Sequence, residues 1–390
     1  MKFYTSESPK IVSDFAKEFN FESLRPYYDS ESREAMHRIA HYESYLKIMA
    51  YMWPEMTQED AIQKALNVDS PYQFQTEFMR NAIWKIVKSS STDLTWSGLE
   101  HLDKNTAYLY VANHRDILLD SAILQIILDK EGFETSEITF GSNLMAEGFI
   151  TDFGRMNRMI PIKRDGNTKE LYEISRQLSA YIRHTILDKK VSVWIAQRNG
   201  RTKDGKDMTQ TGLLKMLNMS GTESLKENMK QLNIVPISIS YEYEPCDHYK
   251  VQESFISMNE KYVKAPGEDL NSVLTGIKQP KGRIHLAFGK PINEEIDQIS
   301  EGLNENEKIK CVTALIDRQI HQNYYINAVN YIAYDLSNQT NRFEEHYNAS
   351  EKESFINYID SKIVSLKGEP DILKKIFIAL YANPVESTLL

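Results

Sequence analysis

The stretch that decides the fold runs Thr106-Ala107-Tyr108-Leu109-Tyr110-Val111-Ala112-Asn113-His114-Arg115-Asp116-Ile117-Leu118-Leu119-Asp120-Ser121. Its first half is apolar and predicts a buried β-strand, and its last residues predict the start of a helix. A histidine and two carboxylates therefore fall where a strand ends and a helix begins. Ligands and catalytic groups usually lie at the carboxyl ends of strands in α/β sheets, so this stretch predicts a site as well as a fold.

The polar turn in this stretch supports two interpretations. In the first, His114 is a general base, because an imidazole there can take a proton from an alcohol while a nearby carboxylate holds its tautomer. In the second, Asn113 or Asp116 caps the following helix and His114 is simply exposed. Both interpretations can hold together, because Asp116 is well placed to cap the helix.

From about Gly98 onward, short apolar segments alternate with helical patterns. The predicted strands are 107–112, 138–141, 159–162, 191–196, 234–243 and 283–288, and the predicted helices include 168–187 and 209–232. Such alternation predicts a sheet buried on both faces, with parallel pairs. We therefore predict an α/β fold with a mixed, mostly parallel sheet flanked by helices.

Both ends of the chain carry apolar residues at helical spacing. The Ser-rich stretch 89–92 is the predicted boundary between the N-terminal helices and the strand-containing region. We predict a helical N-terminal domain over 1–92, a central domain over 93–300 and a helical C-terminal extension over 301–390.

Composition narrows the class of protein. The chain has 390 residues, a net charge of −9 and only two cysteines, Cys246 and Cys311, without metal-ligand spacing. This usage fits a reducing compartment and favours neither a disulfide framework nor a zinc site. The N-terminus lacks the apolar core of a signal peptide, and no run of about 18 apolar residues occurs. The expected location is the cytoplasm, or the inner face of the membrane as a peripheral protein.

The charge is unevenly distributed. Residues 155–206 contain 13 Lys or Arg against 5 Asp or Glu, which favours an anionic ligand or surface. One predicted strand ends in Lys163-Arg164, and another opens into a turn with Arg198, Gly200 and Arg201. Guanidinium groups bind phosphate bidentately, and a glycine lets the backbone approach a ligand. The alternative is that these residues are solvated turns and helix faces.

A fourth segment, 233–243, is an apolar strand that contains Pro236 near its start. Proline cannot donate a ladder hydrogen bond, so it predicts an edge strand or a bulge. An apolar wall of this kind would suit an acyl chain, although an ordinary core strand is equally consistent with the pattern.

In this order and approximate spacing, the four segments resemble the phospholipid/glycerol acyltransferase superfamily over about residues 95–290. The hallmark of that family is a His and an Asp separated by four residues, then a basic block, a Gly-Arg block and a Val-Pro block. The block Trp194-Ile195-Ala196…Gly200-Arg201 looks more like that of soluble plastid glycerol-3-phosphate acyltransferases than the Pro-Glu-Gly-Thr-Arg form of membrane lysophosphatidate acyltransferases. The whole chain looks most like bacterial glycerol acyltransferases.

The sequence departs from the family pattern at two places. Five residues separate His114 from Asp120, and the position where the family has its aspartate is Leu119. We take Asp120 as the partner of His114 and keep Asp116 as the runner-up. Asn199 stands where many relatives have a glutamate or a glycine, which bears on the acceptor more than on the reaction.

The resemblance implies transfer of a fatty acyl group from acyl-CoA or acyl carrier protein to the hydroxyl of glycerol-3-phosphate or a lysophospholipid. It implies His114 as the base, Asp120 as its partner and backbone N–H groups at the helix N-terminus for the oxyanion. The implied phosphate-binding residues are Lys163, Arg164, Arg198 and Arg201, with Gly200 shaping the turn. No cofactor, metal or nucleic-acid partner is expected. Weak peripheral contact with a membrane is expected.

Three alternatives stay open at this point. The same fold could acylate another acceptor, such as lysophosphatidate or an amino-acid-headed lipid. The displaced aspartate slightly favours a non-catalytic lipid-binding or scaffold relative. A metal-dependent hydrolase using His114, Asp116 and Asp120 is the least supported, because no motif supplies a second histidine cluster.

Overall fold

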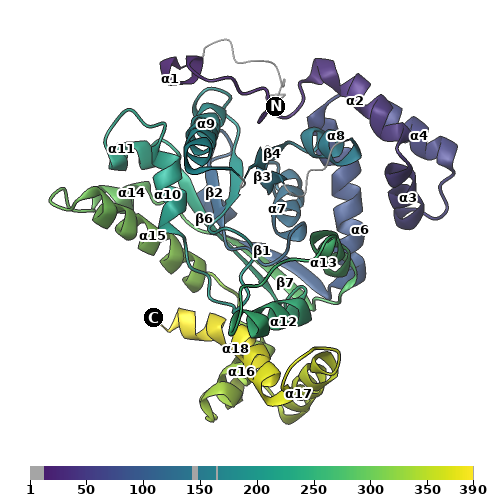
Figure 1. The fold of residues 1–390 in the computed structure, drawn as a ribbon, viewed down its shortest axis with the longest axis vertical. Helices are drawn as coiled ribbons and strands as arrows, with labels where there is room; N and C mark the ends of the chain where they lie inside the picture. The colour runs from purple at the N-terminus through teal and green to yellow at the C-terminus, as the bar shows by residue number, and fades with distance from the viewer. Residues whose placement is uncertain (1–12, 143–147, 164–165, 390) are drawn as a thin grey trace.

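The computed structural model describes residues 13–142, 148–163 and 166–389. In this part of the chain, a seven-stranded sheet is covered by helices on both faces (Figure 1), so the predicted α/β class is confirmed. The strands are β1 (Asp93–Ser97), β2 (Leu109–Ala112), β3 (Glu137–Gly141), β4 (Met159–Ile162), β5 (Val193–Ala196), β6 (Ile234–Tyr241) and β7 (Arg283–Phe288).

The strands lie in the order β1-β7-β6-β2-β5-β3-β4. All described pairs are parallel except β6 with β7, which makes the sheet mixed and mostly parallel as predicted. The strand before the polar turn, β2, lies at the centre between β5 and β6. Its carboxyl end therefore meets those of its two neighbours at one edge of the sheet.

Side chains of β2 alternate between two cores. Tyr110 and Ala112 join the core shared with the N-terminal helices, whereas Leu109 and Val111 join the core on the opposite face. This alternation is the two-residue period of a strand buried on both faces. The sheet is thereby held rigid beneath the polar turn.

The helices that precede β4 cover one face of the sheet, except Asp14–Lys17, which contacts the helix Thr168–Leu187 on the other face. They are α1 (Asp14–Lys17), α2 (Asp29–His41), α3 (Glu43–Met52), α4 (Gln58–Leu66), α5 (Pro71–Gln73), the π-helix Phe74–Met79, α6 (Arg80–Ser90), the 3-10 helix Leu99–His101, α7 (Leu119–Lys130) and α8 (Phe149–Met156). Members of α2, α3, α6 and α7 share one hydrophobic core with the strands. Where a domain boundary lies within this arrangement stays a prediction.

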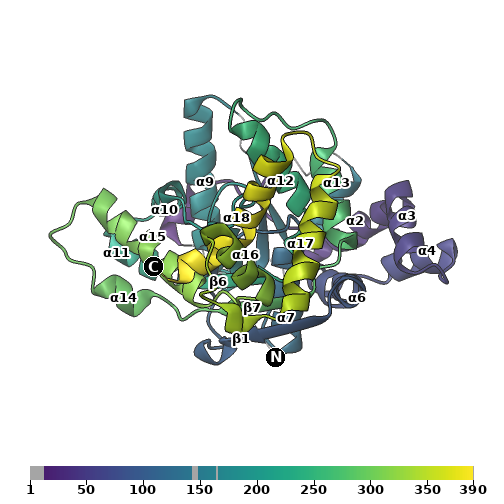
Figure 2. The same cartoon turned by 90° about the horizontal axis from the view of Figure 1, so that it is seen from below.

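The second face, the C-terminal part and the rest of the first face, where the helix Glu268–Lys278 contacts α6, are also helical. Their helices are α9 (Thr168–Leu187), α10 (Thr211–Asn218), α11 (Leu225–Lys230), α12 (Asp247–Ser257), α13 (Glu268–Lys278), α14 (Asn293–Asp297), α15 (Glu305–Gln322), α16 (Ala328–Asn338), the 3-10 helix Glu344–His346, α17 (Ala349–Ile363) and α18 (Pro370–Thr388). The last three helices form a separate hydrophobic cluster with α12, and Figure 2 shows them gathered beside it.

Local sequence explains why α9 matches its predicted bounds. Asn167 accepts the backbone N–H groups of Lys169 and Glu170, and the Glu170 carboxylate accepts the N–H of Asn167. This reciprocal capping box satisfies N–H groups that a helix start would otherwise leave unpaired.

Three sequence-based expectations about the elements were wrong. The edge strand β1 was missed, because it is short, polar at several positions and only partly buried. The single helix predicted over 209–232 is two helices, since a turn at 219–224 ends the first and Ser224 caps the second. The edge position predicted for Pro236 is also wrong, because β6 lies inside the sheet. Pro236 immediately precedes Ile237, whose pair with Phe288 is the last pair between β6 and β7 at this end. The proline is tolerated because it lies where this pairing ends.

Candidate active site

A cavity of about 640 Å³ opens at the carboxyl ends of the central strands. His114, which follows β2, lines it together with residues of β3, β4 and β5, with residues that follow β4 and β5, and with residues of α9 and α10. This is the edge at which α/β sheets usually bind ligands. The polar turn singled out in the sequence therefore faces a space large enough for a small substrate.

Within the turn, His114 and Asp120 are hydrogen-bonded. The distance from His114 Nδ1 to Asp120 Oδ2 is 2.8 Å, and the Asp120 carboxylate is buried. Because Nδ1 is engaged by the carboxylate, Nε2 is the nitrogen left to exchange a proton with a substrate. The extra residue between the two does not separate them, although the catalytic roles of both stay a prediction.

Backbone donors also hold Asp120. Its Oδ2 accepts the N–H groups of Arg115 at 2.6 Å and Asp116 at 2.9 Å. These two hydrogen bonds link the end of the turn to its start. They also fix the orientation of the Asp120 carboxylate toward the His114 imidazole.

Asp116, the runner-up, has a different place. Its Oδ1 accepts the N–H groups of Leu118 and Leu119, so it caps α7, while Oδ2 is buried without a partner. Burial, followed by the nearby Asp120, raises the pKa of the Asp116 carboxyl. The hydrogen bond to His114 is made by Asp120, and capping falls to Asp116.

These bonds change one part of the expected mechanism. The N–H groups of Arg115, Asp116, Leu118 and Leu119 are all occupied by the two carboxylates. They are therefore not free to hold an oxyanion, as the sequence-based interpretation of the helix N-terminus had expected.

A buried network of charged side chains holds Arg115 and therefore the polar turn in place. Arg115 donates to Asp207 at 2.5 Å and to Glu244 at 3.0 Å, and Lys250 donates to Glu244 and to the backbone oxygen of Arg115. The two cations and two carboxylates balance, which is the arrangement that makes buried charge tolerable. Tyr381 of α18 donates its hydroxyl to Asp247 and accepts the N–H of Glu244, so the C-terminal helices brace this network.

Most of the cations expected from the sequence line the cavity. Lys163, Arg198 and Arg201 are among its lining residues, as is Gly200. Gly200 has a φ of +76° and open space where a Cβ would be, so it supplies the left-handed turn that joins the two arginines. Arg164 lies outside the described residues.

Arg201 carries the clearest sign of an anion site. Its side chain is only 7% exposed and its Nη1 has no hydrogen-bond partner. A buried guanidinium nitrogen without a partner is costly, and a phosphate or carboxylate oxygen from a ligand would satisfy it.

Sequence reasoning missed several cavity residues. Lys203, which bonds Glu253 of α12, lies two residues after Arg201 and could have been included in that turn. Lys264 and Asp269 reach the cavity from the connection before α13 and from α13 itself, and no motif marked them. Trp194 of β5 had no predicted role, yet its ring packs edge-on against the His114 ring, with 5.8 Å between the ring centroids.

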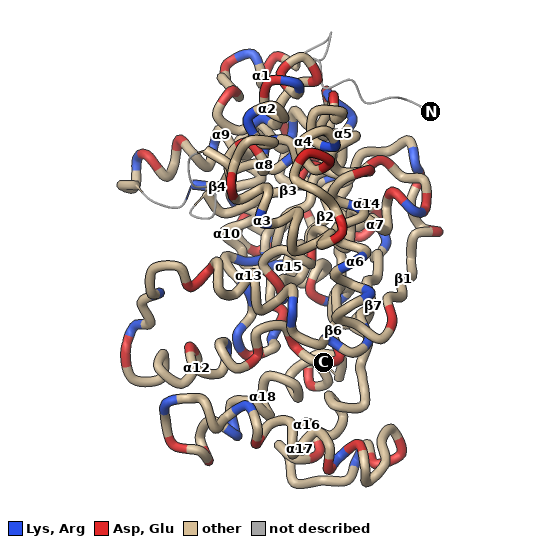
Figure 3. Tube along the Cα trace, turned by 90° about the vertical axis from the view of Figure 1, so that its right-hand side faces the viewer, with Lys and Arg blue, Asp and Glu red and all other residues tan. Residues whose placement is uncertain are grey.

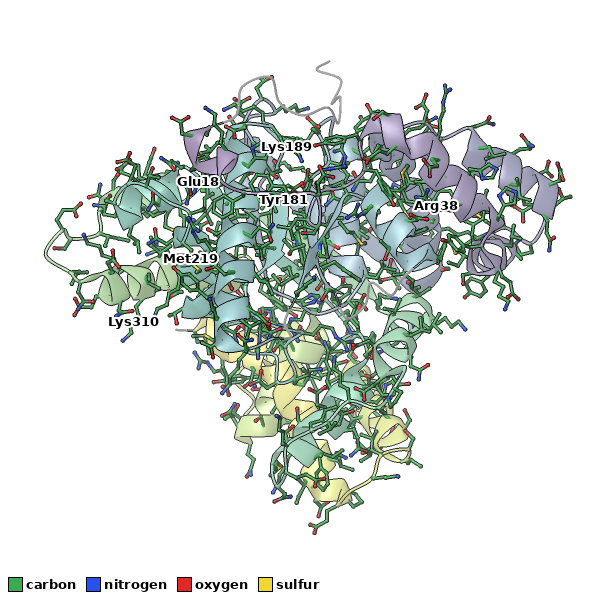
Figure 4. All side chains as sticks on the ribbon, turned by 45° about the horizontal axis from the view of Figure 1, so that its top comes forward. Glu18, Arg38, Tyr181, Lys189, Met219 and Lys310 are labelled. Atoms are coloured by element: carbon green, nitrogen blue, oxygen red, sulfur yellow. The ribbon has the colours of Figure 1, made fainter. Side chains whose placement is uncertain are left out.

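Not all of the basic segment serves the cavity. Arg176 pairs with Glu18 on the outer flank of the molecule (Figure 4), and Lys189 bonds Glu137 and Tyr181. Over the described trace, both Lys and Arg and Asp and Glu are spread across the molecule, and neither sign is confined to one end (Figure 3). The local excess of positive charge is therefore divided between the cavity and ordinary helix faces.

Two kinds of feature are absent from the described residues. No group of three or more His, Cys, Asp and Glu side chains is placed to hold a metal ion. Within the same part of the chain, every helix is too short or too polar to cross a bilayer.

Comparison with known proteins matches one part of the chain to a family. Residues 93–240 match the family model described as "Acyltransferase". Among solved structures, the crystal structure of the 1-acyl-sn-glycerophosphate (LPA) acyltransferase PlsC from Thermotoga maritima is similar at 12% identity, covering 73% of this chain and 92% of that one with a TM-score of 0.37. The comparison with curated proteins found no match. Residues 93–240 thus carry an acyltransferase-family segment, which includes β2, the polar turn, the strands β3 to β5 and all of β6 but its last residue.

Proposed function

We propose that this protein transfers a fatty acyl group from an acyl thioester to the hydroxyl of glycerol-3-phosphate or a lysophospholipid, as a step of phospholipid synthesis. The observation that carries the proposal is the His114–Asp120 pair, which opens onto a cavity lined by basic side chains within the acyltransferase-family segment. The acyl donor is acyl-CoA or acyl carrier protein, and the site of action is the cytoplasm or the membrane surface facing it.

The proposed step uses His114 as a general base. Nε2 removes the proton of the acceptor hydroxyl as its oxygen attacks the thioester carbonyl carbon, and Asp120 stabilises the imidazolium that forms. The new C–O bond then replaces the C–S bond, and the imidazolium returns its proton to the leaving sulfur. Atoms and charge balance without a cofactor.

The cavity suits both ends of such a substrate. Arg201, with its unpartnered Nη1, would bind the acceptor phosphate together with Lys163 and Arg198, and Arg164 belongs to the same proposal. Apolar side chains form another part of the wall and would contact the acyl chain; they include Ile174, Leu178, Leu213 and Met216. Holding both reactants beside His114 raises their effective concentration.

Replacing Arg201 with alanine tests the phosphate assignment. We expect the KM for glycerol-3-phosphate to rise about 10- to 150-fold, which corresponds to the roughly 1.5–3 kcal/mol of a charged hydrogen bond. The KM for the acyl donor should change much less, and unphosphorylated glycerol should be a poor acceptor for both proteins. Thiol release from an acyl thioester measures all three.

The matched control is Arg176→Ala, which removes an arginine of the same basic segment from the outer surface. Arg176→Ala should leave the KM values for glycerol-3-phosphate and for the acyl donor near those of the wild type. An equal loss toward both acceptors in Arg201→Ala would assign Arg201 to the fold or to the donor. Lipid binding without turnover of any acceptor by the wild type would instead indicate a non-catalytic relative.

The charge of Lys203 should make acceptor binding depend on pH. Burial, together with the neighbouring Arg201, lowers the pKa of Lys203 to about 8. Above that pH the Lys203 ammonium loses its positive charge, so the cavity becomes more negative. We expect the KM for glycerol-3-phosphate to rise between pH 8 and 9, and Lys203→Arg, which keeps its charge, to abolish this rise. A wild-type KM that is flat across this interval would contradict the assignment.

A further inference from the structure

The Asp120 carboxylate has one further partner, outside the turn. Its second oxygen, Oδ1, accepts a hydrogen bond of 2.8 Å from the hydroxyl of Tyr241. Tyr241 is 1% exposed and ends β6, far from the turn in sequence. The carboxylate is thus held on both oxygens, by His114 and the turn on one and by Tyr241 on the other.

Strand register explains how this tyrosine reaches the turn. Ile237 of β6 pairs with Ala112, the last residue of β2. Tyr241 lies four residues further along β6, beyond the end of β2, and belongs to the same core as Ile237 and Ile239. A strand that outruns its neighbour therefore places a hydroxyl against the loop that the neighbour begins.

We propose that Tyr241 is a positioning residue of the reaction, holding the Asp120 carboxylate in the orientation that serves His114. The inference rests on the proposed function, because it concerns the same base. Burial, then Asp120 and Asp116, raises the pKa of Tyr241 well above its usual value. The phenol therefore stays protonated at every working pH and acts only as a donor to the carboxylate.

This hydrogen bond also regulates how strongly Asp120 acts on the imidazole. A carboxylate that shares its charge with a phenol attracts the imidazolium less than one without that donor. Other ionisable groups that interact with Asp120 or Tyr241 include Asp116 in the turn, Glu244 after β6 and Tyr324 after α15. None of them is changed when only the Tyr241 hydroxyl is removed.

The test compares Tyr241→Phe with Tyr181→Phe. Tyr181 is an equally buried tyrosine whose hydroxyl donates to the buried Glu137 carboxylate at 2.8 Å, outside the cavity. Titration of the histidine ring protons by NMR, with His114→Gln used to assign the His114 signal, gives the pKa of His114 in each protein. Thermal unfolding shows that each variant folds.

In Tyr241→Phe we expect the pKa of His114 to rise by about 0.5 to 1 pH unit, the size that a single hydrogen bond allows. The acidic limb of kcat/KM should move to higher pH by the same amount, because the base must be unprotonated. Tyr181→Phe should lower the melting temperature by a comparable amount. It should leave the pKa of His114 and the acidic limb of the kcat/KM profile unchanged.

A second comparison separates positioning from general stability. In an Asp120→Asn background, Tyr241→Phe should no longer move the pKa of His114, because the carboxylate that couples the two is absent. The inference is overturned if Tyr241→Phe leaves the pKa of His114 and the pH profile unchanged, or if its effect persists in the Asp120→Asn background. The titration needs no turnover, so a protein without acyltransferase activity would refute the proposed function while still deciding the role of Tyr241.

Discussion

The variant His114→Ala is expected to transfer acyl groups about 10²- to 10⁴-fold more slowly than the wild type, because it lacks the general base. The loss should fall on kcat, since the cations expected to bind the acceptor are untouched. Thiol release at saturating donor and acceptor measures it. The imidazole makes one hydrogen bond, to Asp120, and an edge-on ring contact with Trp194, so the purified variant should unfold at a temperature close to that of the wild type.

A folded His114→Ala protein with wild-type turnover would show that the reaction does not use this histidine. Histidine residues outside the cavity provide the comparison. His184 is buried against Asp188 on α9 in a similar hydrogen bond of 2.7 Å. His184→Ala should affect stability and leave kcat unchanged, which separates loss of a buried histidine from loss of the base.

The second large effect is expected for Asp120→Asn, with a fall in kcat of about 10²- to 10⁴-fold. The amide oxygen can still accept from the turn, and its NH2 can donate to the Tyr241 hydroxyl oxygen, so the fold should survive. What is lost is the negative charge that stabilises the imidazolium and keeps the proton on Nδ1. Single-turnover measurements with a preformed complex would place the loss in the chemical step.

Asp116→Asn is the informative counterpart. The asparagine oxygen can still cap α7, so activity should fall far less than in Asp120→Asn. The raised pKa of Asp116 means that its ionised form destabilises the folded state. This penalty is absent below the unfolded pKa of about 3.9, grows as the pH rises from there to the folded pKa, and is constant above it. The neutral amide avoids that penalty, so the thermal stability of Asp116→Asn should depend less on pH across this interval. A larger loss of kcat in Asp116→Asn than in Asp120→Asn would reverse the two assignments.

Much of the fold was predictable from local sequence. The strands β4 and β7 and the helix α9 have the predicted bounds, because apolar runs and a capping box specify them within a few residues. The edge strand β1 was not predictable in the same way. It pairs on one side only, so its sequence carries no continuous apolar run, and its partner β7 lies almost two hundred residues away.

The candidate site, like the fold, was predictable from sequence only in its local features. Sequence by itself determined that a histidine, two aspartates and several basic residues follow strand ends, because strand and helix patterns are local and parallel strands end at a common edge. The order of these segments also pointed to the acyltransferase family, which the match over residues 93–240 supports.

Only the tertiary structure decided which groups meet. The carboxylate beside His114 is set by the path of one turn, in which Asp120 folds back onto the N–H groups of Arg115 and Asp116 while Tyr241 arrives from another strand. Lys264 and Asp269 reach the cavity through a connection with no motif of its own. Such contacts depend on strand register and on packing between distant segments, and these properties do not repeat along the chain in a pattern that a sequence displays.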